Sequence, residues 1–275
     1  MKFAVNENTI FQCDLIDYLI SSRKAGFSAV EISYSKLKDA LRFVSAQEIR
    51  KQCTGLEVLS LNAFEDVFFV PEDNVKALEA EAFLIGELCR VIECPVVVVP
   101  SGRWYSKYGA LPEYKDLINI SQNRLGMVKE ILDRFEVETM FEPIDYPEFH
   151  IGTPSEINTL LSDEKFNNLR IVPDIHNLHY NGLGPSQLLE INADIGIFHI
   201  DDTPDIPHEK LHVATTRVFP GDGIARAADW VRTACDRGYQ GYFSLELFDA
   251  EIYRQTPDFA LTLCRRKLDT FAKSL

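Results

Sequence analysis

Short apolar runs alternate with longer segments of helical periodicity along the whole chain. The runs at residues 95–100 and 195–198 are apolar at nearly every position, as expected for strands buried on both faces of a parallel sheet. Between such runs, apolar residues recur three or four positions apart, as Leu15, Tyr18 and Leu19 do. The predicted strands are residues 2–5, 29–33, 58–62, 95–100, 137–141, 169–172, 195–198 and 242–245. The predicted helices are residues 14–24, a segment that starts at 45, and residues 75–91, 113–135, 154–161, 185–191, 224–237 and 256–273.

This order of elements amounts to eight strand–helix units, which in 275 residues are typical of a TIM barrel. Ser45 and Glu48 form a capping-box pattern at a predicted helix start, and Gly238 follows another helix as a natural C-cap. A doubly wound open sheet would usually carry a glycine-rich turn after its first strand, and residues 6–9 contain no glycine. No linker or low-complexity segment divides the chain. We therefore predict an α/β protein with a single (β/α)8 TIM barrel domain over residues 1–275.

Four consecutive predicted strands are followed at once by side chains that can bind a metal, namely Glu142, Asp174, His199 and Glu246. One carboxylate after a strand is more often the N-cap of the next helix. In a barrel, however, the C-terminal ends of the strands meet at one mouth, and three carboxylates buried together repel one another unless a cation compensates. We therefore predict that these four residues bind one divalent ion. Oxygen-rich ligands with one imidazole suit Zn²⁺, Mn²⁺, Mg²⁺ or Co²⁺.

Such a site predicts chemistry on a hydroxy-ketone. A divalent ion acts there as a Lewis acid that stabilises a developing enediolate, and a carboxylate beside the substrate carbon can take a proton and return it. Arg217, before a Pro-Gly-Asp-Gly turn, is a candidate to hold a substrate oxygen, the alternative being a surface salt bridge with Asp201 or Asp202. Further candidates for substrate contact follow other predicted strands. They are Asn62, Trp104, Glu148, His176 and Asn177.

Several of these candidates have an equally simple structural interpretation. Trp104 can serve ordinary packing rather than cover a sugar ring, and Glu148 can be a solvated loop residue. Of the polar residues that follow Asp174, one is expected to contact substrate and the rest to be loop groups. Glu31, in the predicted strand at 29–33, is expected to point to the same mouth of the barrel as Asn62, which ends the strand at 58–62.

The overall composition and charge disfavour some classes of binding partner. The formal net charge of −14 disfavours binding to nucleic acid, which depends on cationic side chains that displace counterions. Six cysteines are scattered without a Cys-x-x-Cys pair, which indicates buried thiols in a reducing compartment. The N-terminus lacks the pattern of a signal peptide, and no apolar run reaches the length of a membrane span. We expect a cytoplasmic protein that acts on a small molecule, without a membrane partner.

The strand-end residues and the motifs around them resemble those of the xylose isomerase-like sugar isomerase/epimerase superfamily. The resemblance extends over nearly the whole chain. The motifs are His-Ile-Asp-Asp-Thr from His199, Pro-Gly-Asp-Gly after Arg217, and Gly-Tyr-x-Gly-Tyr-x-Ser-x-Glu-Leu-Phe ending at Phe248. Within the superfamily the sequence is most similar to the inosose (keto-inositol) isomerases. It shares with them the opening Met-Lys-x-x-x-Asn-Glu and the Leu-Asn-Ala that begins at Leu61.

The resemblance implies a TIM barrel with zinc or manganese on the four strand-end residues. It further implies that Glu142 and Glu246 move a proton between adjacent carbons of a cyclitol or sugar, while Arg217 holds the substrate. One departure concerns the substrate: many relatives have a histidine three residues after the aspartate, where this chain has Asn177, between His176 and His179. Barrels of this type often form homo-oligomers, although the sequence contains no interface pattern.

The expected function is therefore a divalent-metal-dependent sugar or keto-polyol isomerase or epimerase, with inosose as one substrate. A dehydratase or lyase that acts on a keto-polyol or a dehydroshikimate-like substrate would use the same metal site and end in loss of water. A phosphodiesterase resembling endonuclease IV would need a cluster of several metals rich in histidine, whereas His199 alone stands clearly at a strand end. A barrel that only binds a ligand is the fourth alternative, which the intact carboxylates disfavour.

Overall fold

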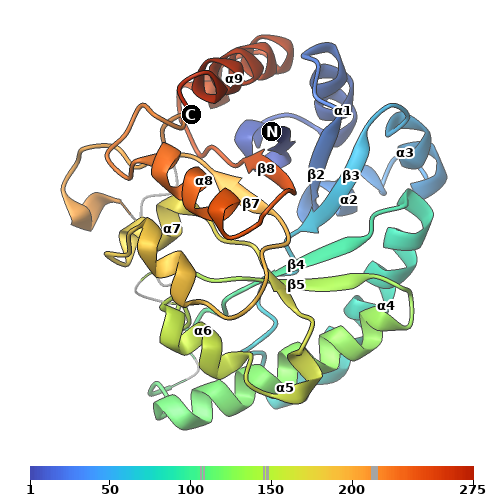
Figure 1. The fold of residues 1–275 in the computed structure, drawn as a ribbon. Coiled ribbons are helices and arrows are strands. Elements are labelled where there is room, and N and C mark those ends of the chain that lie inside the picture. Colours follow the sequence, from blue (N-terminus) through green and yellow to red (C-terminus); the bar gives the residue numbers. More distant parts are fainter. Residues whose placement is uncertain (106, 108, 145, 147–148, 212–215) are drawn as a thin grey trace.

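The computed structural model describes residues 1–275 with the exception of residues 106, 108, 145, 147–148 and 212–215. In this part of the chain, eight parallel strands form one curled sheet that helices surround as a ring (Figure 1). The order in the sheet is β6-β5-β4-β3-β2-β1-β8-β7, so that consecutive strands are neighbours. The strands are β1 (Lys2–Asn6), β2 (Ala29–Ser33), β3 (Glu57–Asn62), β4 (Val96–Pro100), β5 (Glu138–Glu142), β6 (Arg170–Ile171), β7 (Phe198–Ile200) and β8 (Tyr242–Leu245).

The two outer strands of this order meet through single bridges rather than a ladder. Parallel bridges join Ile171 to Ile195 and Asp174 to His199, and the backbone N–H of Gly196 donates to the carbonyl of Ile171 at 2.8 Å. These contacts close the sheet on itself, which confirms the predicted TIM barrel.

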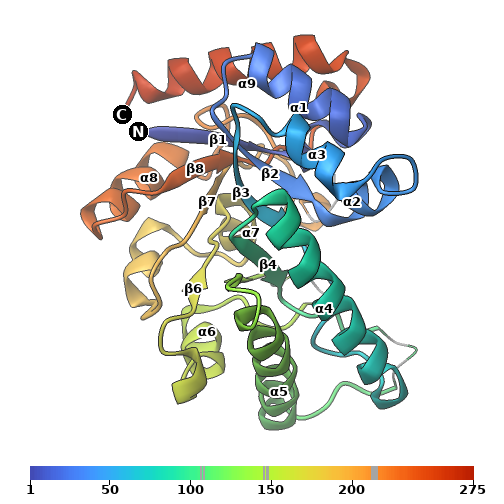
Figure 2. The same ribbon diagram turned by 90° about the vertical axis from the view of Figure 1, so that its right-hand side faces the viewer.

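The helices occupy the predicted places between the strands, with two additions. They are α1 (Leu15–Lys24), α2 (Tyr34–Ala40), α3 (Ala46–Gln52), α4 (Val75–Ile92), α5 (Tyr114–Asp133), α6 (Pro154–Leu160), α7 (Ile175–Tyr180), α8 (Ala227–Asp236) and α9 (Pro257–Ala272). The short helices α2 and α7 were not predicted, and the segment Pro185–Glu190 is a 3-10 helix. Figure 2 shows both ends of the chain close together beside α9. None of the described helices is both long and apolar enough to cross a membrane.

Local signals explain several helix boundaries. The Ser45 side chain accepts the backbone N–H of Glu48 at the start of α3, which is one half of the predicted capping box. A reciprocal capping box forms instead at α6, between Thr153 and Glu156. Gly238 lies at φ 91°, a backbone conformation that glycine adopts without steric cost, and it ends α8 as predicted.

The seventh strand is the element whose position was wrong. The ladder with β8 begins at Phe198 and continues to Ile200, three residues later than the predicted strand at 195–198. The reason lies at Gly196, where an added Cβ would sit 2.3 Å from the sulfur of Met140. The chain passes so close to the barrel interior at this point that it touches β6 through single bridges before it joins β8.

Two apolar layers support the barrel. A large cluster fills the space between the sheet and the helices. A smaller cluster fills the barrel interior, where each residue is at most 6% exposed; its members are Ala4, Ala29, Leu59, Val96, Val98, Met140, Val172 and Ile197. This inner cluster closes the barrel interior with packed side chains, because protein interiors leave few voids, and it forms the floor of the barrel mouth. Whatever the barrel binds must therefore lie above it, at the C-terminal ends of the strands.

One buried acid, Glu7, follows β1 directly and begins a short 3-10 helix, Glu7–Ile10. The Oε2 of Glu7 accepts the backbone N–H of Ser33 at 2.8 Å, and no polar partner reaches its Oε1 among the described residues. Burial raises the pKa of Glu7 to about 8, although the hydrogen bond from Ser33 and the charge of Lys36 lower it; Asp14 adds to the increase.

Candidate metal centre and substrate pocket

The alternation of side chains along a strand explains how the polar groups reach the barrel mouth. In β5, Met140 belongs to the inner cluster, so Glu142, two residues further on, points inward as well. The same two-residue step leads from Ile197 to His199 in β7. The apolar floor and the polar rim are therefore two successive layers of one pattern.

The four predicted metal ligands meet at one point. Glu142, Asp174, His199 and Glu246 each offer a ligand atom, and these atoms all lie within 4.8 Å of one another. From Nδ1 of His199 the nearest carboxylate oxygens are 3.4 Å away in Glu142, 4.0 Å in Asp174 and 3.3 Å in Glu246. All four residues are buried. Three carboxylates and an imidazole at this spacing are a set of donors that could hold a divalent ion.

The imidazole of His199 is oriented from behind by Glu31. Its Nε2 lies 3.1 Å from Oε1 of Glu31, whose Oε2 in turn accepts the hydroxyl of Ser60 at 2.6 Å. Burial opposes ionisation of Glu31, but the charge and hydrogen bond of His199 lower its pKa below the usual value. On the other side of the ring, Nδ1 is buried and has no hydrogen-bond partner in the described part of the chain. A carboxylate behind the ring and a free nitrogen in front are the arrangement found in metal-ligating histidines, so these residues fit a divalent ion.

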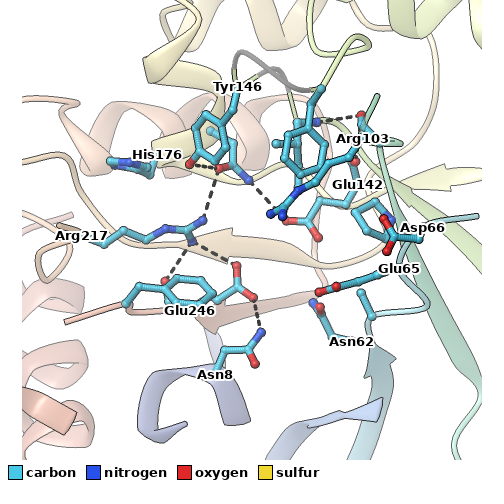
Figure 3. A pocket seen from close by; sticks show the side chains of 17 residues that line it. Asn8, Asn62, Glu65, Asp66, Arg103, Glu142, Tyr146, His176, Arg217 and Glu246 are labelled. Atoms are coloured by element: carbon cyan, nitrogen blue, oxygen red, sulfur yellow. Dashed lines mark hydrogen bonds and ion pairs between the residues drawn. The ribbon is translucent and has the colours of Figure 1, made fainter. Parts of the chain in front are cut away.

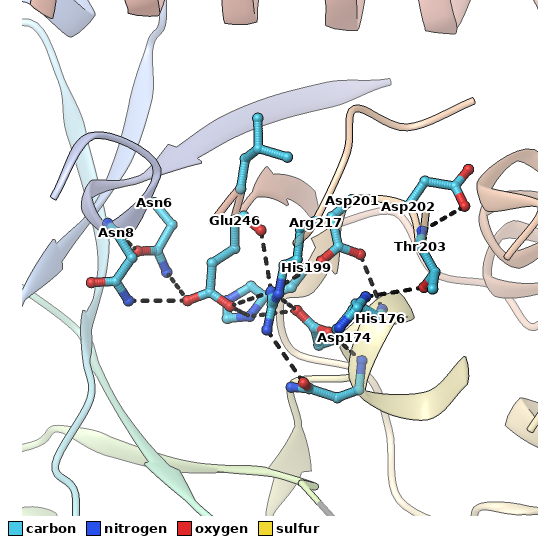
Figure 4. A network of polar contacts seen from close by, with 12 residues as sticks. Asn6, Asn8, Asp174, His176, His199, Asp201, Asp202, Thr203, Arg217 and Glu246 are labelled. Carbon is cyan, nitrogen blue, oxygen red and sulfur yellow. Dashed lines mark hydrogen bonds and ion pairs between the residues drawn. The ribbon is translucent and has the colours of Figure 1, made fainter. Parts of the chain in front are cut away.

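Glu246 is held by neutral and cationic donors. Its Oε1 accepts the side-chain amides of Asn6 at 3.1 Å and Asn8 at 3.2 Å, while its Oε2 faces His199 and lies 3.0 Å from Nη1 of Arg217 (Figure 4). Burial opposes ionisation, but the nearby imidazole and guanidinium together bring the pKa of Glu246 down to about 2. This carboxylate is therefore fixed in position and strongly favoured in its charged form.

Glu142 lies in a different environment from Glu246. Burial raises its pKa to about 7, since the contacts with His199 only partly offset the lost hydration and the charges of Glu246 and Asp174 add to the increase. The side-chain amide of Asn177 approaches it at 3.5 Å. The two glutamates thus flank the same point with opposite preferences for a proton.

Arg217 is a buried cation that binds the same carboxylates. Its Nη1 lies 2.6 Å from Oδ2 of Asp174 and 3.0 Å from both Oε2 of Glu246 and Oδ2 of Asp201. The guanidinium is stacked on the ring of Phe248, 4.6 Å from its centre, and the residue is 8% exposed. Burial by itself would lower the pKa of Arg217, but the surrounding carboxylates raise it well above its usual value. The alternative of a surface salt bridge is therefore wrong, although Asp201 is indeed a partner.

Asp202 holds the loop that carries Arg217. Its carboxylate accepts the backbone N–H groups of Thr203, Gly221 and Ala225 at 2.9, 3.0 and 2.8 Å. Gly223 is needed in the same turn, since an added Cβ would lie 2.3 Å from the carbonyl oxygen of Thr203. The Asp-Asp and Pro-Gly-Asp-Gly motifs therefore combine one carboxylate that pairs with Arg217 and one that anchors its loop.

A cavity of about 420 Å³ opens above the metal centre (Figure 3). Its volume is within the range of small-molecule sites. Of the residues predicted to bind metal or substrate, six line it: Asn62, Glu142, His176, Asn177, Arg217 and Glu246. Both ring nitrogens of His176 are already engaged, with Thr203 and Leu211, and burial lowers the pKa of this imidazole to about 3. Asn177 turns its amide oxygen to Arg217 and to the hydroxyl of Tyr146, at 3.2 and 2.6 Å.

Two of the predicted substrate-binding residues are not among the described residues that line the cavity. Trp104 is not part of the described cavity lining; its ring packs edge-on against Phe69 and its Nε1–H donates to the carbonyl of Gly109. Glu148 lies outside the described residues. Their contacts with substrate remain predictions.

Several cavity residues were missed from the sequence. Tyr146, Phe248 and Asn8 contact the predicted ligands directly or through one neighbour. The only signal for Asn8 is its place just after the first strand, and none was available for Tyr146. Glu65, Asp66 and Arg103 line the side of the cavity away from Arg217, and their loops show no motif that could have indicated this.

The xylose isomerase-like TIM barrel family model matches residues 21–263. The chain belongs to this family. It is 26% identical to the inosose isomerase of Halalkalibacterium halodurans over 268 residues, which cover 95% of this chain and 93% of that protein. It is 28% identical to the inosose isomerase of Bacillus licheniformis over 262 residues, with 92% and 91% covered.

Solved structures of other proteins share the fold. The crystal structure of the IolI protein with a bound zinc atom matches with a TM-score of 0.90 and 22% identity, and the match covers 100% of this chain and 99% of that one. D-Psicose 3-epimerase from Clostridium cellulolyticum with D-tagatose matches with a TM-score of 0.77 and 16% identity, covering 99% of each chain. At these identities the likeness confirms the barrel alone.

Proposed function

We propose that this member of the xylose isomerase-like family is a divalent-metal-dependent isomerase or epimerase of ketoses or keto-polyols, with inososes as its substrate class. The observation that supports it best is the buried Nδ1 of His199, which faces three carboxylates at the floor of the cavity. The cavity volume of about 420 Å³ is sufficient for a cyclitol or sugar ring. The similarity to inosose isomerases over more than nine tenths of the chain agrees with this substrate class.

Glu142, Asp174, His199 and Glu246 would hold the ion, and zinc or manganese are the metals we expect. When bound, the ion supplies Lewis acidity that stabilises the enediolate of a hydroxy-ketone. The zinc in the IolI structure is consistent with such a site in a protein of the same fold.

Residues of the chain would transfer the proton and hold the substrate. Glu142 and Glu246 flank the reacting carbons, so one removes a proton from a carbon and the other, or the same one, returns it to the adjacent carbon or the opposite face. Arg217, fixed by Asp174 and Phe248, would hold a substrate oxygen by donating from its buried guanidinium.

The test is solvent exchange at the substrate carbon. We expect the zinc- or manganese-loaded protein to incorporate deuterium from D₂O next to the carbonyl of 2-keto-myo-inositol, as followed by NMR. Glu142→Gln and Glu246→Gln should each slow exchange by about 100-fold or more, the usual contribution of a positioned acid or base. The matched control is Glu57→Gln, at the N-terminal end of β3, which should leave exchange unchanged. If the purified protein retains no metal, or if both variants exchange at the wild-type rate, the proposal is wrong.

A further inference from the structure

The cavity has a second polar wall that the proposed chemistry does not use. Glu65 and Asp66 in the loop after β3, and Arg103 in the loop after β4, line the cavity on the side opposite Arg217 (Figure 3). No motif marked these residues in the sequence.

The side chains of this wall are only lightly tied to the fold. Glu65 makes no hydrogen bond or ion pair with any other residue that the structure describes. Asp66 accepts one hydrogen bond, from the hydroxyl of Tyr105 at 3.2 Å, and the guanidinium of Arg103 lies over the ring of Phe149, 4.7 Å from its centre. The carboxylates of Glu65 and Asp66 therefore keep most of their hydrogen-bonding capacity for the cavity and its solvent.

The charges of the cavity favour an uncharged ligand. The described lining contains four carboxylates, from Glu65, Asp66, Glu142 and Glu246, against the guanidinium groups of Arg103 and Arg217. A divalent ion would compensate Glu142 and Glu246, but the opposite wall would still carry the two carboxylates of Glu65 and Asp66 against Arg103 alone. Arg217 is already neutralised by its carboxylate partners. A phosphate or carboxylate on the substrate would have to approach Glu65 and Asp66, at a cost from like-charge repulsion in a partly desolvated site. Hydroxyl groups meet no such cost, since they donate to carboxylates and accept from a guanidinium.

We propose that Glu65, Asp66 and Arg103 form a subsite for the hydroxyl groups of an uncharged polyhydroxylated ketone, on the part of the ring remote from the reacting carbons. This rests on the proposed function in one respect, namely that the reacting carbons lie at the end of the cavity near Glu142, Glu246 and Arg217. The remaining hydroxyls of a ring held there extend toward the opposite wall. The subsite selects neutral cyclitols or ketoses and rejects their phosphates and acids.

Glu65→Gln and Asp66→Asn test the subsite, because each keeps the size of the side chain and removes its charge. A hydrogen bond to a charged group contributes enough that each change should raise KM for 2-keto-myo-inositol by roughly 10-fold, with kcat within about twofold of wild type. Both positions are exposed, so the variants are expected to fold. Glu81→Gln is the matched control: Glu81 lines a neighbouring depression together with Glu65 and Asp66 but is absent from the described lining of the cavity, and its KM should not change.

Binding is measured separately from turnover, by calorimetry of the metal-loaded protein with myo-inositol and with fructose 6-phosphate. We expect myo-inositol to bind more tightly than the phosphate, and Glu65→Gln to weaken the binding of myo-inositol by roughly 10-fold. Unchanged KM and unchanged binding in both variants would overturn the subsite, as would tighter binding of the phosphate to wild type. If wild type binds myo-inositol in a Glu65-dependent manner without catalysing exchange, the subsite stands and the proposed function fails. If exchange occurs but is indifferent to Glu65 and Asp66, the function stands and the subsite fails.

Discussion

Replacement of Glu31 by glutamine is the most direct way to separate the orientation of His199 from its presence. Two donors point at the Glu31 carboxylate, the imidazole Nε2 at 3.1 Å and the Ser60 hydroxyl at 2.6 Å, and the side chain is fully buried. A carboxylate accepts from both. A glutamine amide has one accepting oxygen, so its NH₂ group must face one of the two donors.

The magnitude follows from the two ways in which the variant can respond. If the ring keeps its hydrogen on Nε2 and donates to the amide oxygen, the Ser60 hydroxyl must turn to accept from the NH₂ group and its own hydrogen loses its partner, which costs about 1–3 kcal/mol of stability. If the ring instead moves its hydrogen to Nδ1 and accepts from the amide, the nitrogen that faces Glu142, Asp174 and Glu246 no longer has a free lone pair. Either response weakens a metal site, and we expect the dissociation constant for zinc to rise by about 10- to 100-fold, as is typical when the partner behind a ligating histidine is lost.

The assay is competition with a chromophoric chelator, accompanied by thermal unfolding of the metal-free and metal-loaded protein. Wild type should gain more stability from the metal than Glu31→Gln does, because an ion that binds only the folded state stabilises it according to its affinity. Glu57→Gln at the other end of the barrel serves as the control for the loss of one negative charge. A folded Glu31→Gln protein that binds zinc within twofold of wild type would refute the reasoning.

Two further predictions concern stability. Since Glu7 has a pKa of about 8 when folded against 4.5 as its ordinary value, the folded protein binds more protons between these pH values, and its free energy of unfolding falls as pH rises through that window. In urea unfolding, the free energy of unfolding of Glu7→Gln should rise relative to that of wild type by on the order of 3–5 kcal/mol between pH 4 and pH 9. If the free energies of unfolding of the two proteins change with pH in parallel, the prediction is wrong. Gly223→Ala places a methyl group 2.3 Å from the Thr203 carbonyl oxygen and should destabilise the protein by about 1–3 kcal/mol. The control is Gly184→Ala, whose methyl group would meet only a side-chain atom at 3.4 Å and should cost less stability. Equal effects of the two changes on the melting temperature would count against the tight turn.

The barrel and the convergence of the four candidate metal ligands could be predicted because both depend on local order in the chain. Strands with apolar side chains on both faces indicate a parallel sheet, and a polar residue directly after such a strand lies at the barrel mouth whatever the tertiary detail. Glu142, Asp174, His199 and Glu246 each satisfy this rule, so their convergence required only that the barrel close. The family resemblance added the expected metals and roles.

What could not be predicted depends on contacts between distant segments. Glu31 was placed at the mouth from the sequence, but its hydrogen bond to His199 joins residues 168 positions apart. The shift of β7 follows from the proximity of Gly196 to Met140, which no periodicity reveals. The wall formed by Glu65 and Arg103 comes from two loops without a motif, and their approach is decided by the paths of those loops over the barrel.

The junction where β6 meets β7 would give a bound metal ion a second role, in holding the barrel closed. Asp174 and His199 are bridge partners across this junction, which otherwise relies on a few backbone hydrogen bonds such as that from His199 N–H to the Pro173 carbonyl at 2.9 Å. An ion bound by both side chains would join the two strands at a junction that lacks a continuous ladder. Release of the ion would leave this junction to its backbone hydrogen bonds, so loss of the metal should lower the protection of these backbone N–H groups against hydrogen exchange.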